Sequence, residues 1–83
     1  MDPESKPDIE ISENPEFGWI VICHPKLTDL FDAALSKRNI LSRLKRNAII
    51  YSSYNEDSFT IAKEILKKEL QEARVEALSH LKP

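Results

Sequence analysis

Two apolar segments of the chain, residues 19–22 and 48–51, are each followed by side chains that could carry out chemistry. These side chains are Cys23 and His24 after the first segment, and Ser52, Ser53 and Tyr54 after the second. If the two segments are parallel strands, a thiol, an imidazole and several hydroxyls meet at one sheet edge, beside helix N-termini that attract anions. The pattern therefore suggests an anion pocket, or a thiol nucleophile assisted by His24.

A structural role explains the same residues and is the interpretation we favour. Neighbouring residues on a strand point to opposite faces, so Cys23 and His24 are not naturally paired. A strand cysteine is commonly buried, and His24 stands before Pro25 as a helix cap would. Gly18 is the only glycine, so the chain has no glycine-rich phosphate loop. We expect no enzyme activity, and whether these side chains form a ligand pocket stays open at this point.

Residues 37–46 contain five basic side chains and no acidic one. The five are Lys37, Arg38, Arg43, Lys45 and Arg46. Such a segment could contact phosphates or an acidic protein partner, or it could be a solvated helix face. An isoelectric point near 5.6 and six acidic residues among residues 1–16 argue against nucleic acid. Nucleic-acid binding through this basic segment is our second functional hypothesis.

Metal, cofactor and membrane binding find no support in the sequence. His24 and His80 have no metal-ligand spacing, and one cysteine can form neither an intramolecular disulfide nor a metal site alone. The longest apolar run, residues 19–23, is far shorter than the roughly 20 residues of a membrane helix. The acidic, proline-bearing start does not resemble a secretory signal, so a cytoplasmic protein is expected.

The chain length allows one small α/β domain of the α+β kind. Residues 1–7 are polar and proline-bearing, which predicts a flexible acidic arm before a single domain over residues 8–83. Alternating polarity predicts a strand at residues 8–12, and a continuous apolar run predicts a central strand at residues 17–23. The single glycine in that run indicates a bulge or a close backbone approach.

A helix is predicted from Pro25, because proline favours the first helical position and apolar residues then recur at helical spacing. The next apolar set points about a quarter turn away from the first, which predicts a break near residues 37–39. A short second helix carrying Ile40, Leu41 and Leu44 is expected after the break. Its basic residues would then face solvent.

The last part of the chain predicts a strand at residues 48–51 and one long helix over about residues 56–81, capped by Asn55. The predicted order is strand, strand, broken helix, strand, long helix. A right-handed crossover would make the strands at residues 17–23 and 48–51 parallel neighbours in a three-stranded mixed sheet.

This last helix carries our leading functional hypothesis. It would span roughly 39 Å, more than the breadth of about 30 Å expected for a domain of this size, so its end should overhang. Its apolar stripe also rotates in the second half, and exposed apolar area usually marks a protein interface. Alternatively, the N-terminal arm or the first strand covers it. We expect a non-enzymatic interaction or assembly module, acting as a homodimer or a complex subunit, with an interface formed by Ala73, Val75, Ala77, Leu78 and Leu81.

Overall fold

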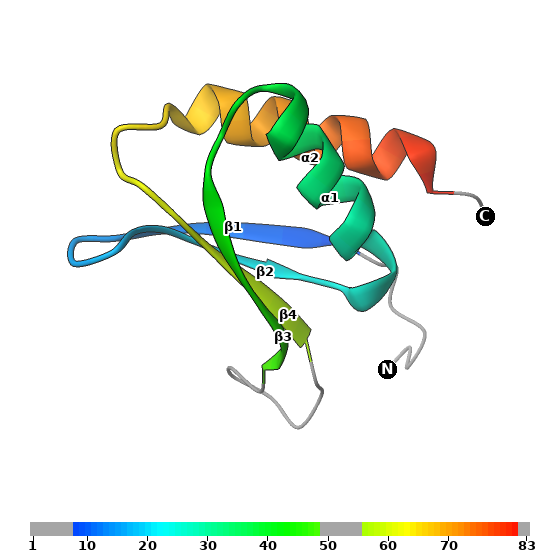
Figure 1. Cartoon of the computed structure of the whole chain (residues 1–83), viewed down its shortest axis with the longest axis horizontal. Coiled ribbons are helices and arrows are strands. Elements are labelled where there is room, and N and C mark those ends of the chain that lie inside the picture. The colour runs from blue at the N-terminus through cyan, green and yellow to red at the C-terminus, as the bar shows by residue number, and fades with distance from the viewer. Residues whose placement is uncertain (1–7, 49–55, 82–83) are drawn as a thin grey trace.

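The computed structural model describes residues 8–48 and 56–81. Within them the strands are β1 (Ile9–Asn14), β2 (Gly18–Cys23), β3 (Ser42–Ala48) and β4 (Glu56–Ile61), and the helices are α1 (Pro25–Lys37) and α2 (Lys67–His80). The strands form one sheet in the order β1-β2-β4-β3, and every neighbouring pair is antiparallel. Both helices cover the same face of this sheet, so the domain has two layers (Figure 1).

The two halves of the domain repeat one topology. Each half consists of two strands followed by a helix: β1, β2 and α1 in the first, and β3, β4 and α2 in the second. The halves join along the central strands, where Val21 of β2 pairs with Phe59 of β4. Because β2 and β4 are antiparallel, an approximate two-fold axis between them, normal to the sheet, would exchange the two halves.

The core fills the space between the sheet and the helices. Val21 and Phe59 project into it from the central strands, and Phe31 of α1 packs edge-on against Phe59 with ring centroids 5.1 Å apart. On the inner face of α2, Leu70 is completely buried, and so are Ala73 and Ala77. Small side chains at these two positions let the backbone of α2 lie close to its neighbours.

The start and the end of α1 agree with the sequence. Nδ1 of His24 accepts a hydrogen bond from the backbone N–H of Lys26 at 3.0 Å, and Pro25 is the first helical residue. This bond satisfies one of the free N–H groups that every helix N-terminus exposes. The helix ends at Lys37, within the predicted break, and Asn39 then adopts a positive φ of 60°.

Gly18 marks a close approach of two backbone segments, as its position predicts. Its φ is +104°, a backbone conformation that residues with a side chain rarely adopt. A Cβ atom at this position would lie 2.4 Å from the carbonyl oxygen of Ile61 and 2.6 Å from the backbone nitrogen of Lys63. Only glycine lets β2 begin directly against the end of β4.

The prediction of a second short helix after α1 is wrong, because residues 42–48 form strand β3. In this strand Leu44 packs against the core, while Arg43 and Lys45 are exposed on the opposite face. This alternation has the period of two that a half-buried strand requires. Pairing with β4 selects the strand over the predicted helix.

The extent of the last helix is also corrected. Residues 56–61 form β4 rather than the first turns of a helix, and α2 begins only at Lys67. The 14 residues of α2 span about 21 Å, little more than half of the predicted length. With β4 inserted between β2 and β3, the sheet has four antiparallel strands, and the predicted parallel pair does not exist.

Some predictions lie outside the described residues. These are the flexible arm at residues 1–7 and all of the predicted third strand except Ala48, which ends β3. In the part of the chain that the structure does describe, neither helix is long and apolar enough to cross a membrane.

Candidate functional site

Cys23 belongs to a small buried polar cluster between the sheet and the start of α1. The hydroxyl of Thr28 donates a short hydrogen bond of 2.5 Å to Oδ2 of Asp57, and Thr28 Oγ1 lies 3.9 Å from Sγ of Cys23. Arg46 of β3 approaches from the rim, with NH1 3.8 Å from the same Asp57 oxygen. Cys23, Thr28 and Asp57 are at most 2% exposed, so the cluster is sealed from solvent. It joins β2, β3, β4 and α1.

The thiol in this cluster is poorly suited to act as a nucleophile. Burial raises the pKa of Cys23 to about 12, and the negative charges of Asp57 and Glu56 add to the effect, whereas the hydrogen bond from Thr28 opposes it. A thiol with such a pKa is almost entirely protonated near neutral pH. His24, whose Nδ1 accepts the Lys26 amide, is engaged as the helix cap.

The other residues of the predicted pocket cannot be joined to this cluster, since Ser52, Ser53 and Tyr54 lie outside the described residues. His80 is exposed at the end of α2, far along the chain from His24. Among residues 8–48 and 56–81, no three histidine, cysteine, aspartate or glutamate side chains are grouped as metal ligands would be.

The five residues of the basic segment do not share one surface. Lys37 and Arg38, at the C-terminus of α1, form ion pairs with Glu76 of α2. Nζ of Lys37 lies 3.4 Å from one oxygen of the Glu76 carboxylate, and NH1 of Arg38 lies 2.9 Å from the other. The hydrogen bond from Arg38 is the main reason that the pKa of Glu76 is lowered. On the helix-covered face of the sheet, NH2 of Arg46 lies 3.0 Å from Asp29.

The remaining two basic residues, Arg43 and Lys45, lie on the face of the sheet that the helices leave uncovered. Strand register places Arg43 beside Thr60 and Lys45 beside Ser58. The same face carries an acidic residue, Glu10, on the opposite edge strand. Its charge thus runs from acidic at β1 to basic at β3.

The residues of the predicted interface on the last helix have three different environments. Ala73 and Ala77 are fully buried in the protein's own core, and Leu78 and Leu81 are partly buried against it. Val75 alone of the five is strongly exposed, at 59%. The rotated apolar stripe of the sequence is thus the inner face of α2 together with one flank that reaches Val75.

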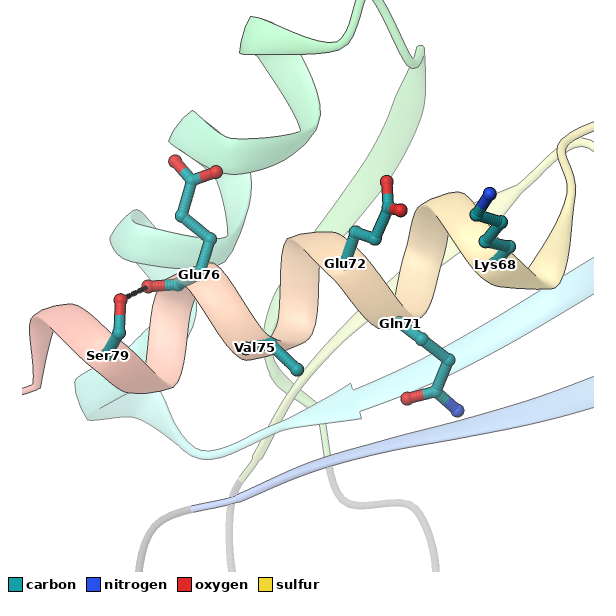
Figure 2. A pocket seen from close by; sticks show the side chains of 6 residues that line it. All are labelled: Lys68, Gln71, Glu72, Val75, Glu76 and Ser79. Atoms are coloured by element: carbon teal, nitrogen blue, oxygen red, sulfur yellow. Dashed lines mark hydrogen bonds between the residues drawn. The ribbon is translucent and has the colours of Figure 1, made fainter.

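The exposed surface of α2 forms a shallow, open groove along the helix (Figure 2). It is lined by Lys68, Gln71, Glu72, Val75, Glu76 and Ser79. Figure 2 shows Gln71 and Val75 projecting to one side of the helix, and Glu72 and Glu76 projecting to the other. The second side is that of α1, because Glu76 pairs with Arg38.

The first side of α2 faces the edge strand β1, to which Arg74 ties the helix. Nε of Arg74 donates a hydrogen bond of 3.0 Å to the carbonyl oxygen of Ile9, and its NH2 lies 2.8 Å from Oδ1 of Asp8. Asp8 Oδ1 also accepts the backbone N–H of Ile9 at 2.7 Å. Both outward backbone groups of Ile9 are therefore satisfied by side chains. We call the surface formed by β1 and by Gln71, Val75 and Leu78 of α2 the β1–α2 edge.

Sequence reasoning could not find this edge. Arg74 and Ile9 are 65 positions apart, and their contact depends on β1 being an outer strand below α2. Local periodicity carries information about which face of a helix is apolar, but none about which strand the flank of the helix will meet. The sequence contains one signal for this surface: Val75 is an apolar residue between the charged Arg74 and Glu76.

In comparisons with known proteins, no protein-family model, no curated protein sequence and no solved structure matches this chain.

Proposed function

We propose that the protein is a non-enzymatic interaction module that binds another protein along the exposed flank of α2. The observation that carries this proposal is Val75, a large apolar side chain that is 59% exposed within the groove on α2. Exposed apolar area that is rimmed by polar residues often marks a protein interface, and Val75 has polar side chains around it.

The way in which α2 is held supports this role. Its inner face is fixed by the buried Ala73 and Ala77, one flank by the bonds of Arg74 to β1, and the other by the ion pair between Glu76 and Arg38. A helix fixed on three sides presents its outer residues without a large ordering cost on binding. The protonated, sealed thiol of Cys23 is also consistent with a non-enzymatic role.

The alternative, nucleic-acid binding by the basic segment, would rely on Arg43 and Lys45. The other three basic residues are engaged in ion pairs with acidic residues of this chain: Lys37 and Arg38 with Glu76, and Arg46 with Asp29 and Asp57. Two phosphate contacts give only weak binding, and the acidic Glu10 on the same face would oppose it. We therefore keep the protein partner as the proposed function.

Site-specific photo-cross-linking tests the proposal. A photoreactive amino acid replaces Val75 in one version of the full chain and the exposed Ala33 of α1 in a control version. A partner cross-linked from position 75 but not from position 33 is identified, purified and titrated against the unmodified chain by calorimetry. We expect Val75→Lys to weaken this binding at least tenfold while the circular dichroism spectrum stays unchanged. Equal cross-linking from both positions, or undiminished binding by Val75→Lys, would refute the proposal.

A further inference from the structure

The edge strand β1 has backbone hydrogen-bonding groups that point away from the sheet. The backbone N–H of His24 donates to the carbonyl oxygen of Asp8 at 3.2 Å. The backbone N–H and C=O groups of even-numbered residues in this segment therefore point toward β2, and those of odd-numbered residues point outward. The outward groups of Ile9 are bonded by Asp8 and Arg74. The next outward pairs belong to Ile11 and Glu13, and no described side chain covers them in the way that Arg74 covers Ile9.

Such an edge is a template for one more strand, and natural proteins usually block it. Here side chains bond the outward backbone groups of Ile9, the first residue of β1, and among the described residues the edge beyond Ile9 is not blocked in this way. A strand added beside Ile11 and Glu13 would pair its backbone with theirs, which is the general mode of peptide recognition at sheet edges.

The flank of α2 would form the wall of this site. Gln71 and Val75 project to the side of the helix on which Arg74 reaches β1 (Figure 2). Ile11 on the helix-facing side of β1 and Leu78 on α2 are partly buried apolar residues that pack against the core. A side chain of an added strand that lies opposite Ile11 would therefore meet apolar groups, and an apolar side chain suits this position best.

The charge of the edge determines the rest of the ligand. Glu10 is exposed on the face of β1 away from the helices, Glu13 is exposed on the face toward them, and Glu16 follows in the turn. Asp8 is already paired with Arg74. Opposite charges directly across two strands are favourable, and like charges are unfavourable. An added strand with basic side chains is therefore favoured, and two β1 strands of separate copies would repel each other.

We propose that the β1–α2 edge binds an extended segment of a partner protein that carries lysine or arginine opposite Glu10 and Glu13 and joins the sheet beside β1. This proposal rests on the proposed function and specifies the chemistry of the partner. An apolar residue of the segment faces Ile11, and its basic residues face Glu10 and Glu13.

The test uses a displayed library of ten-residue peptides, selected on the full chain. Every position is drawn equally from Val, Leu, Lys, Arg, Ser, Glu and Asp. We expect Lys and Arg to be enriched about two- to fivefold over the acids at two positions about three residues apart, as expected for cross-strand ion pairs with Glu10 and Glu13. Failure to select any peptide, or enrichment of acidic residues, would overturn the proposal.

A pair of variants at one residue separates strand addition from simple charge attraction. Glu13→Pro removes the outward N–H without breaking the β1–β2 ladder, and Glu13→Gln removes the charge alone. By fluorescence anisotropy with the most enriched peptide, we expect Glu13→Pro to weaken binding about tenfold and Glu13→Gln by less than threefold. Equal effects of the two variants would show that no strand is added.

Amide hydrogen exchange on the unaltered protein provides a measurement that does not depend on the folding of a variant. The selected peptide should slow exchange at Ile11 and Glu13 by at least tenfold, and unchanged exchange there would overturn the proposal. Self-association of the chain with the same two amides protected would identify a second copy as the occupant and would overturn it as well. If the cross-linked partner depends on Val75 but not on the Glu13 backbone N–H, the proposed function stands and strand addition fails.

Discussion

Trp19 and Ile65, 46 positions apart in the chain, are joined by a hydrogen bond of 2.8 Å from the indole Nε1 to the carbonyl oxygen. The bond anchors the connection between β4 and α2 to the start of β2. The other half of the domain has a counterpart: Asp57 on β4 accepts the hydroxyl of Thr28 near the start of α1. Trp19 and Asp57 are the second residues of the two central strands, so each central strand fixes the helix of the opposite half.

We expect Trp19→Phe to lower the free energy of unfolding by about 1–2 kcal/mol, because a hydrogen bond and part of a buried ring are lost. Urea unfolding followed by circular dichroism measures the change. Phe17→Leu is the control: Phe17 is 61% exposed, and its replacement should alter stability by less than about 0.5 kcal/mol. Equal effects of the two substitutions would contradict the anchoring role of Trp19.

We expect Thr28→Val to lower the free energy of unfolding by about 1–3 kcal/mol, since it removes a donor from a buried carboxylate while nearly conserving volume. The matched control is Thr60→Val on the half-buried, uncovered face of the sheet, where a β-branched apolar residue is well accepted. Chemical denaturation of both variants provides the measurement. A Thr28→Val protein as stable as the unaltered one would mean that Asp57 does not need this hydroxyl.

Gly18→Ala should be among the more damaging single substitutions, with a loss of at least about 2 kcal/mol. The added Cβ would be placed 2.4 Å from the carbonyl oxygen of Ile61, and the φ of +104° disfavours any side chain. Thermal unfolding reports the loss as a lower midpoint. An unchanged midpoint would show that the β2–β4 approach can widen at little cost.

The buried thiol of Cys23 predicts a pH dependence of stability. Its pKa is raised in the folded protein to about 12 from the ordinary value of 9.0, so the folded state holds its proton more tightly than the unfolded state. This contribution is fully present below about pH 9 and is lost as pH rises from there toward 12. Urea midpoints measured between pH 8 and 11 should fall, and the fall should be smaller in Cys23→Ala. A slope that is unaffected by this substitution would assign the effect to other groups.

A salt titration distinguishes the nucleic-acid alternative from the proposed function. Because Arg43 and Lys45 are the two exposed basic residues on the uncovered face, any binding to a single-stranded oligonucleotide should have a slope of log K against log salt no steeper than about −2. Fluorescence anisotropy between 20 and 200 mM salt measures it. A slope beyond about −4, abolished by Arg43→Ser with Lys45→Ser, would favour nucleic acid over the protein partner.

The sequence predicted the first half of the fold well and the second half poorly, for identifiable reasons. Pro25, His24 and Gly18 are local signals whose physical effects do not depend on distant residues, and the structure bears out all three. The residues of β3 and β4 fit helical spacing as well as a strand pattern. Their conformation is decided by pairing with each other and with β2, which is a tertiary effect.

The candidate site also contains residues that the sequence could predict and residues that it could not. The exposed Val75 could be found from the mismatch between its apolar side chain and its polar surroundings. The burial of Ala73 and Ala77 could not be distinguished from an interface, because an apolar helix stripe has the same pattern whether the protein's own core or a partner covers it. The edge position of β1 follows from the strand order, which no local pattern encodes.

The repeated half-domain topology also has a kinetic consequence. Each hairpin with its helix is built from segments close together in the chain, whereas the pairing of Val21 with Phe59 closes a long loop between the halves. The entropy of closing that loop must be overcome before the central strands gain any hydrogen bond. Docking of the two halves along β2 and β4 is therefore the step that should limit the folding rate. It is also the step at which the bonds of Trp19 and Asp57 to the opposite half first form.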